Sequence, residues 1–191
     1  MQGKPIATLR SRTGIPTGRL AIWWLLASEI VIFGGLLGSY VMHRLAHDAW
    51  SAESAATNTW IGAFNTFVLL TSSLFAVLAH AAAVDGKGKL AAKRLLVTCA
   101  FGATFVVVKA FEWNMEISHG YTITANTFWS FYYTAAGLHA LHVIAGVIIM
   151  LIVAKDAAKN LELHRVELIG IYWHFVDIVW IFLFPLLYIA K

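Results

Sequence analysis

Histidine and acidic side chains that could exchange protons or bind a metal lie inside long apolar stretches of this sequence. His139 and His142 are three residues apart in GLHALHVIAG, and His174 and Asp177 have the same spacing in YWHFVDIVW. Glu29 stands alone in LLASEIVIFGG. Residues three apart share one face of a helix. The histidine pair therefore has a spacing that suits a metal or a haem, and His174 could pair with Asp177 and share its proton.

The stretches that carry these residues are long enough to cross a membrane. The chain has 191 residues, of which 60% are hydrophobic and 13% charged, whereas soluble domains have about 25% charged residues. A transmembrane helix needs about 20 mostly apolar residues. Five stretches qualify, at residues 19–43, 57–84, 92–116, 126–154 and 166–190. We predict an all-α polytopic membrane helix bundle with five transmembrane helices over residues 19–191, preceded by a basic tail at residues 1–18.

Positive charges in the connecting segments predict the orientation of this bundle. Lysine and arginine in short loops mark the cytoplasmic side of a membrane. The N-terminal tail to Arg19 and the loops before the third and fifth stretches carry eleven of them, whereas the other side has only Arg44 and Lys191. The N-terminus is therefore predicted to be cytoplasmic and the C-terminus to lie outside.

Glu29 is expected near the middle of the membrane, about 15 Å beyond Arg19 at 1.5 Å per residue. The other intramembrane candidates come out at a similar depth: His139, His142, His174 and Asp177. A carboxylate that faced lipid would cost several kcal/mol, so Glu29 should face the bundle or a partner protein. Two readings stay open for it: a proton-linked group, or a hydrogen-bonded residue that packs the helix.

Small and polar residues at helical spacing predict helix packing. Gly34 and Gly38 form a small-residue stripe with Ala27 and Val31, on a different face from Glu29, so the first helix should contact protein on two faces. Gly146 lies on the face of the histidine pair. In the second stretch, residues seven apart predict a stripe of hydrogen bonds between helices: Asn58, Asn65 and Ser72.

Three charged residues end the third stretch in KAFEWNMEI. Lys109, Glu112 and Glu116 share one face toward the outer surface, and Lys109 and Glu112 can neutralise each other three residues apart. We expect either an ion pair within the helix near the lipid headgroups or a contact with a partner.

The remaining patterns exclude several classes of site. The one cysteine, Cys99, permits no intrachain disulfide and no cysteine-rich metal site. A metal or haem at the histidine pair would need further ligands at the same depth, and only His174 and His80 are candidates. No phosphate-binding loop is present, and the basic residues lie in short loops, which argues against nucleic-acid binding. We therefore expect no metal and no complete redox centre in the chain.

Several strings, taken in order, resemble subunit III of haem-copper respiratory oxidases such as cytochrome c oxidase, in its short five-helix bacterial form. They are SEIVIFGGLLGSY, NTFVLLTSSLFAVLAH, KAFEW, YYTAAGLHALHVIAG and YWHFVDIVWIFLFPLLY. The resemblance implies a non-catalytic subunit of a bacterial cytoplasmic membrane that packs against subunit I, binds phospholipid and supports proton uptake and oxygen access. It places the haems and copper in subunits I and II and allows a small subunit IV as a further partner.

Alternatives stay open at this point. The short form also occurs in quinol oxidases and in an accessory protein of nitric oxide reductases. Polar residues at one depth would suit an independent proton channel or transporter, although five helices lack the two-fold repeat common in secondary transporters. The histidine pair would suit a membrane anchor that binds haem.

Overall fold

Helices account for nearly all of the secondary structure in the computed structural model, which describes residues 6–9, 14–46 and 50–190. Five helices are long and apolar enough to cross a membrane. They are α1 (Thr17–Ala46), α3 (Thr59–Val84), α4 (Gly88–Ser118), α5 (Thr127–Ala158) and α6 (His164–Phe184), which continues into a π-helical turn, η2 (Pro185–Ile189). A short 3₁₀ turn, η1 (Ile6–Thr8), and a one-turn helix, α2 (Trp50–Ser54), complete the described elements. The predicted all-α bundle with five membrane-length helices is confirmed.

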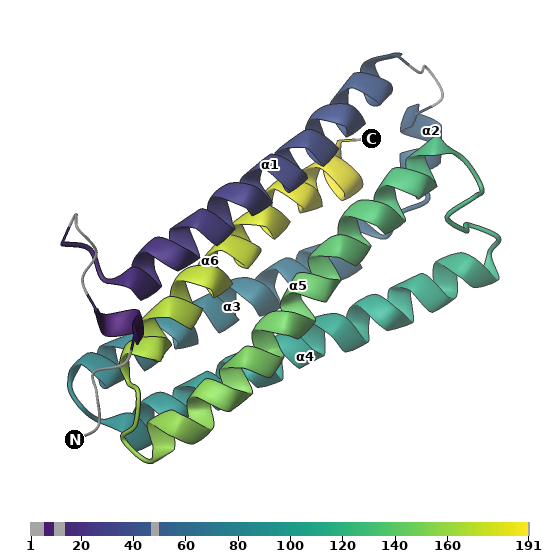
Figure 1. The fold of residues 1–191 in the computed structure, drawn as a ribbon. Helices are drawn as coiled ribbons and strands as arrows, with labels where there is room; N and C mark the ends of the chain where they lie inside the picture. The colour runs from purple at the N-terminus through teal and green to yellow at the C-terminus, as the bar shows by residue number, and fades with distance from the viewer. Residues whose placement is uncertain (1–5, 10–13, 47–49, 191) are drawn as a thin grey trace.

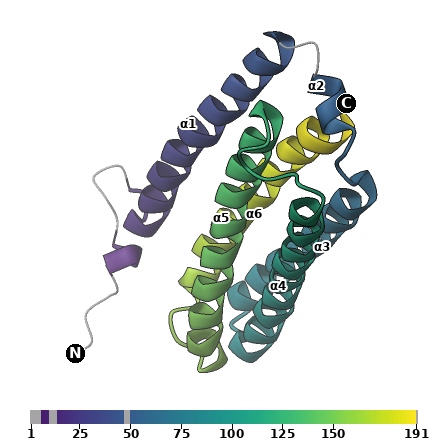
Figure 2. The same cartoon turned by 90° about the vertical axis from the view of Figure 1, so that its right-hand side faces the viewer.

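Helices α3, α4, α5 and α6 pack together, whereas α1 lies to one side of them (Figure 1). The largest contacts join α3 to α4 and α4 to α5, and α6 packs on both α3 and α5. Figure 2 shows α1 running along α6 while it stands apart from α3 and α4. Only Leu26, Phe33 and Tyr40 of α1 are buried, so this helix presents most of its surface outward.

Two helices, α3 and α5, begin at an asparagine whose side chain caps the helix. The side chain of Asn58 accepts hydrogen bonds from the backbone N–H groups of Trp60 and Ile61 at the start of α3. Asn126 does the same for Trp129 at the start of α5. Such side chains satisfy N–H groups that have no partner within the helix. Asn58 thus caps a helix, and the predicted role in a stripe between helices is wrong for this residue.

Helix α4 begins four residues before the predicted start of the third stretch. The backbone N–H of Gly88 donates to the side-chain oxygen of Asn160 at 2.9 Å. A Cβ atom at position 88 would collide with the carbonyl oxygen of Ala157. The close approach of the α5–α6 loop therefore lets α4 extend to a residue that hydropathy alone leaves outside the span.

Trp173 is the central packing residue between α4, α5 and α6. Its indole ring lies between Gly102 and Gly146, where an added Cβ would come within 2.8 Å of the ring on each side. Its Nε1 donates to the Ser72 hydroxyl at 2.9 Å. Glycines allow helix backbones to approach closely in membranes, and here they make room for one buried tryptophan.

The start of α1 and the turn η2 lie at opposite ends of the bundle, which we call the N-terminal end and the C-terminal end (Figure 1). The last carbonyl groups of a helix have no donor within the helix. Three carbonyls of η2, those of residues 186, 187 and 188, accept hydrogen bonds from the hydroxyls of Tyr40, Thr57 and Thr59 respectively. These bonds connect α1, the α2–α3 segment and α3 to the end of the chain.

Candidate functional site

Glu29 on α1 faces His142 on α5, which makes a polar contact between the outlying helix and the others. Oε2 of Glu29 is 3.1 Å from Nε2 of His142, and both side chains are largely buried. Nδ1 of His142 is 2.8 Å from the carbonyl oxygen of Leu138. A carbonyl oxygen only accepts, so Nδ1 carries a hydrogen. Oε2 of Glu29 lies within ion-pair distance of Nε2 but forms no hydrogen bond with a described residue. The contact is an ion pair when the imidazole is protonated.

The Glu29–His142 pair lines a groove between α1 and the α5–α6 face. The groove has a volume of about 580 Å³, and most of its lining is apolar, with residues such as Leu25, Leu141 and Ile149. Arg165 lines it at the N-terminal end of the bundle. The groove thus combines an apolar lining with a Glu–His contact and one cationic side chain.

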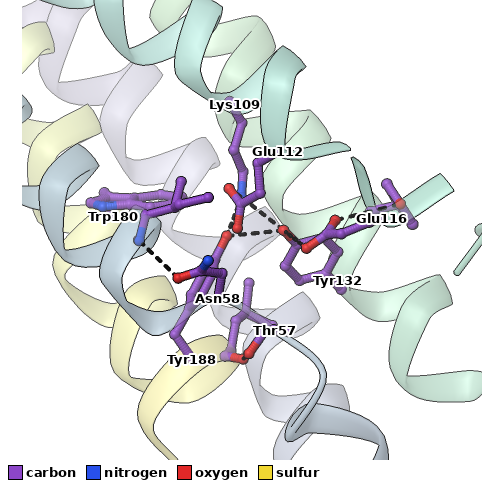
Figure 3. Close-up of polar contacts among 12 residues, drawn as sticks. Thr57, Asn58, Lys109, Glu112, Glu116, Tyr132, Trp180 and Tyr188 are labelled. Carbon is purple, nitrogen blue, oxygen red and sulfur yellow. Dashed lines mark hydrogen bonds and ion pairs between the residues drawn. The ribbon is translucent and has the colours of Figure 1, made fainter. Parts of the chain in front are cut away.

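A second polar group is buried between α4, α5 and η2 (Figure 3). Nζ of Lys109 lies 2.9 Å from Oε2 of Glu112 and 3.0 Å from the hydroxyl of Tyr132, and it also donates to the hydroxyl of Tyr188. The side chains of Lys109 and Glu112 are each 1% exposed. The ion pair is inside the bundle, so these two side chains are not available to a partner.

Glu116 extends this group toward the C-terminal end of the bundle. The hydroxyl of Tyr132 lies 2.9 Å from Oε1 of Glu116, and the hydroxyl of Tyr133 lies 3.5 Å from Oε2. We refer to Lys109, Glu112, Glu116, Tyr132 and Tyr188 together as the lysine cluster. It places one cation and two carboxyl groups in an apolar region.

His139 does not share its surroundings with His142. It is fully buried, stacks on Trp180 with ring centroids 5.1 Å apart, and meets Phe105 edge-on. His142 instead turns toward α1 and Glu29. The two rings have different neighbours, so they do not form a joint haem or metal site. In the described parts of the chain, no group of three or more His, Cys, Asp or Glu side chains could hold a metal ion.

His174 pairs with α3 and not with Asp177. Its Nδ1 is 2.6 Å from the hydroxyl of Ser73. Asp177 is 3% exposed, and neither carboxylate oxygen forms a hydrogen bond with a described residue. The predicted pairing within α6 is therefore wrong, because Ser73 on the neighbouring helix competes successfully for the imidazole.

The residues predicted to pack helices divide into three groups. Ser72 and Gly146 contact Trp173. Asn65 is fully buried, and its amide has no hydrogen-bond partner among the described residues. Gly34 and Gly38 are exposed, and an added Cβ at either would meet nothing within 4 Å, although Gly34 lines a groove between α1 and α6. The stripe on α1 therefore makes no close helix contact within the described chain.

Comparison with known proteins identifies the family. The model of the family described as "Cytochrome c oxidase subunit III" matches residues 8–191, nearly the whole chain. The chain belongs to the cytochrome c oxidase subunit III family. The resemblance seen in the sequence is therefore confirmed, and the five membrane-length helices agree with an integral membrane protein.

Named relatives of the subunit III family cover most of the chain. It is 33% identical over 175 residues to "Cytochrome c oxidase subunit 3" of Thermostichus vulcanus, covering 89% of this chain and 86% of that protein. A protein of the same name from Bacillus sp. (strain PS3) is 30% identical over 179 residues, covering 89% of this chain and 84% of the relative. "Heme-copper oxidase subunit I+III" of Aeropyrum pernix is 32% identical over 183 residues, which are 90% of this chain and 22% of that protein.

Reasoning from the sequence missed the tyrosines of this subunit III chain. Tyr132 and Tyr188 complete the lysine cluster, and both are fully buried. The available signal was Lys109 itself, since a lysine well inside a membrane helix requires buried partners. Tyrosines near the same end of other predicted helices were the candidates, but the rotation of each helix decides which of them point inward.

Glu29→Leu is expected to weaken the attachment of α1 to α5, whereas Glu29→Gln should leave it nearly intact. The glutamine amide keeps a polar group opposite His142, but leucine leaves Nε2 without a polar neighbour, at a cost of about 1–3 kcal/mol. Thermal unfolding of the purified protein measures the difference. Ser28→Leu, an exposed neighbour on α1, is the matched control, and equal stability of both Glu29 variants would refute the role of the pair.

Proposed function

We propose that this chain is the non-catalytic subunit III of a respiratory haem-copper terminal oxidase. It packs against the catalytic subunit I, accompanies subunit II, and stabilises the complex during aerobic electron transport. The haems and copper belong to those partner subunits. The family match over residues 8–191 carries this proposal. The relative named subunit I+III supports direct contact with subunit I, because there the two parts are joined in one chain.

The relatives favour cytochrome c as the electron donor of the proposed complex. Those from Thermostichus vulcanus and Bacillus sp. (strain PS3) are named as cytochrome c oxidase subunits. A quinol oxidase or a nitric oxide reductase remains the alternative setting for this chain. A small subunit IV is a further proposed partner, and the open face of α1 with Gly34 and Gly38 is where we would seek contact with a neighbouring subunit.

The proposed orientation has the N-terminal end of the bundle in the cytoplasm of a bacterial cell. Basic residues gather at that end in the α3–α4 and α5–α6 connections, which supports the positive-inside assignment. Lys4, Arg10, Arg12 and Lys191, which also entered the charge count, lie outside the described residues. In this orientation the lysine cluster and the C-terminus are near the outer face of the membrane.

We further propose that a phospholipid binds in the groove between α1 and the α5–α6 face. The apolar lining suits an acyl chain, and Arg165 at the N-terminal end suits an anionic headgroup. Arg165 is 46% exposed and lies 2.9 Å from Asp156 and 3.7 Å from Glu162, so a lipid headgroup would compete with these two carboxylates for the guanidinium. The Glu29–His142 pair would lie beside the acyl chain. A proton-linked role of Glu29 is part of this proposal.

Ala145→Trp is expected to reduce the amount of phospholipid that stays with the purified protein. Ala145 lines the groove, and an indole at this position fills part of the trough that the acyl chain would occupy. Native mass spectrometry counts the retained lipid. Ala100→Trp, on an exposed face of α4, is the control that should retain lipid like the parent, and equal retention by both variants would argue against the site.

An independent proton channel is the competing function. A proton channel requires a continuous series of titratable groups that runs through the bundle from one membrane face to the other. Glu29 and His142 face each other across the groove, whereas His139 is surrounded by Phe105 and Trp180, and this separation favours the subunit role. Proton flux through the isolated chain in liposomes, abolished by Glu29→Gln, would support a channel.

The subunit inventory of the purified protein tests the proposed function. An affinity tag on this chain should recover haem-copper subunits I and II in fixed proportion, together with a Soret band. Recovery of the chain alone, or with no haem-copper subunit, would contradict the proposal. If the isolated chain keeps a Soret band after its partners are removed, it is a haem-binding anchor instead.

A further inference from the structure

Helix α1 contacts the other helices along one narrow line. Its buried residues, Leu26, Phe33 and Tyr40, are seven apart, which keeps them near one face of a helix with about 3.6 residues per turn. Two grooves flank this line. The groove between α1 and the α5–α6 face contains Glu29. The other contains Ile30 and lies between α1 and α6, and we call it the α1–α6 groove. At about 100° per residue, Glu29 and Ile30 are on opposite sides of the buried line.

The α1–α6 groove is apolar throughout. It has a volume of about 280 Å³, and all its lining residues are hydrophobic or glycine. Phe33 and Val179 are 3% and 6% exposed and lie at its base, whereas Ile30, Ile178 and Phe182 are at least half exposed and border its opening. The groove therefore opens outward from the bundle and suits a purely apolar group.

Gly34 keeps the groove open on the α1 side. It is exposed and lines the groove, and an added Cβ would meet nothing within 4 Å. Ile30 and Leu37 line the groove about one turn before and after it, and residues three or four apart are neighbours on a helix face. The glycine therefore leaves a gap between two large side chains, through which a slender apolar chain can pass.

A cationic side chain lies on the same face of α1, farther toward the C-terminal end of the bundle. Arg44 follows Leu37 by seven residues, in the last turn of the helix, and residues seven apart share a helix face. Along the helix, Arg44 is about 15 Å from Gly34 at 1.5 Å per residue. This length is about half of the hydrocarbon thickness of a bilayer. A phosphate group at Arg44 would therefore place its acyl chain at the level of the groove.

The contacts of Tyr40 place this cation near the junction of α1 and η2. The hydroxyl of Tyr40 donates to the carbonyl oxygen of Leu186 at 2.7 Å. The charge of Arg44 acts on the same hydroxyl. The guanidinium is thus close to the point where α1 meets the end of α6, beyond the last residues that line the α1–α6 groove.

We propose that the α1–α6 groove binds an anionic phospholipid from the leaflet at the C-terminal end of the bundle. One acyl chain lies in the groove and passes Gly34, and the phosphate binds Arg44. Arginine recognises phosphate through paired N–H donors and a fixed positive charge. This site is separate from the groove that contains Arg165, because Arg165 is at the N-terminal end. The inference does not rest on the proposed oxidase assembly.

Native mass spectrometry of the protein extracted from its membrane in a mild detergent tests the acyl-chain part of this site. Gly34→Trp fills the groove and should release one phospholipid per chain. Gly35→Trp is the matched control, because Gly35 is also exposed and meets nothing within 4 Å but does not line the groove. Gly35→Trp should retain the lipid, and Ala145→Trp, in the other groove, should leave this lipid in place.

Variants of Arg44 test the headgroup part. The protein is reconstituted into vesicles of phosphatidylglycerol and phosphatidylcholine, extracted again, and its retained lipid is identified. An Ala145→Trp background excludes lipid held in the other groove. The parent side chain should favour phosphatidylglycerol, and Arg44→Gln should lower this preference roughly fivefold, the ratio that corresponds to about 1 kcal/mol per arginine. Arg44→Lys keeps the charge and should keep most of the preference.

Three results would overturn the proposal. The first is equal lipid retention by Gly34→Trp and Gly35→Trp. The second is a preference for phosphatidylglycerol that Arg44→Gln leaves unchanged. The third is a copurifying protein subunit, instead of a lipid, that Gly34→Trp alone releases, because the groove would then belong to a protein partner. If Gly34→Trp does not fold, the Arg44 variants decide the question, since they leave the groove itself intact.

Discussion

Lys109→Met should destabilise the protein more than any other single change in the lysine cluster. It removes the cation that faces Glu112 and leaves a buried carboxylate and two tyrosine hydroxyls without their donor. Breaking a buried ion pair by deleting one partner costs about 3–5 kcal/mol. In a chain of this length, that loss corresponds to a fall of roughly 10 °C in the midpoint of thermal unfolding.

Two further variants control this prediction. Lys93→Met removes an exposed lysine from the same helix and should stay near the parent midpoint. The double variant Lys109→Met with Glu112→Gln should recover most of the lost stability, because no uncompensated charge remains. A Lys109→Met protein that unfolds with the Lys93→Met control would mean that the cluster contributes little to stability.

Trp173→Ala should cost a similar amount through packing instead of charge. The indole is fully buried between Gly102 and Gly146, and its N–H donates to Ser72. Truncating a buried tryptophan leaves a cavity and costs about 3–5 kcal/mol. Three helices, α4, α5 and α6, lose their common contact, so the midpoint of thermal unfolding should fall strongly.

The glycine side of this contact gives a converse test. Gly146→Leu should also destabilise, by about 1–3 kcal/mol, because a Cβ at this position would lie 2.8 Å from the Trp173 ring. Trp60→Ala, which removes a tryptophan that is 86% exposed, is the matched control. If Trp173→Ala unfolds no earlier than Trp60→Ala, the glycine–tryptophan packing is not the central contact of the bundle.

The helices themselves could be predicted from the sequence because their hydropathy alone determines them. A run of about 20 apolar residues has no stable alternative to a helix within a membrane, and all five expected spans correspond to helices of the structure. The short helix α2 and the π-helical turn η2 have no such signal. The carbonyls of η2 accept hydrogen bonds from Tyr40, Thr57 and Thr59, which reach the turn from distant parts of the chain.

The partners of the polar residues could be predicted only where they lie within one helix. Lys109 and Glu112 are three residues apart, and the expected ion pair forms at 2.9 Å. His174 and Asp177 have the same spacing, yet His174 turns to Ser73 on α3. Spacing defines which residues share a helix face, but the choice between a neighbour on the same helix and one on the next depends on helix rotation. The contact of Glu29 with His142 is of the second kind.

A cryo-EM structure of the complex purified through a tag on this chain is the most direct test of the account. The account predicts this chain bound as a five-helix subunit to a haem-copper catalytic subunit, with the haems and copper in the partners. In that structure the Lys109–Glu112 pair should be buried and Glu29 should face His142. A chain found alone, or one that holds haem between His139 and His142, would contradict it.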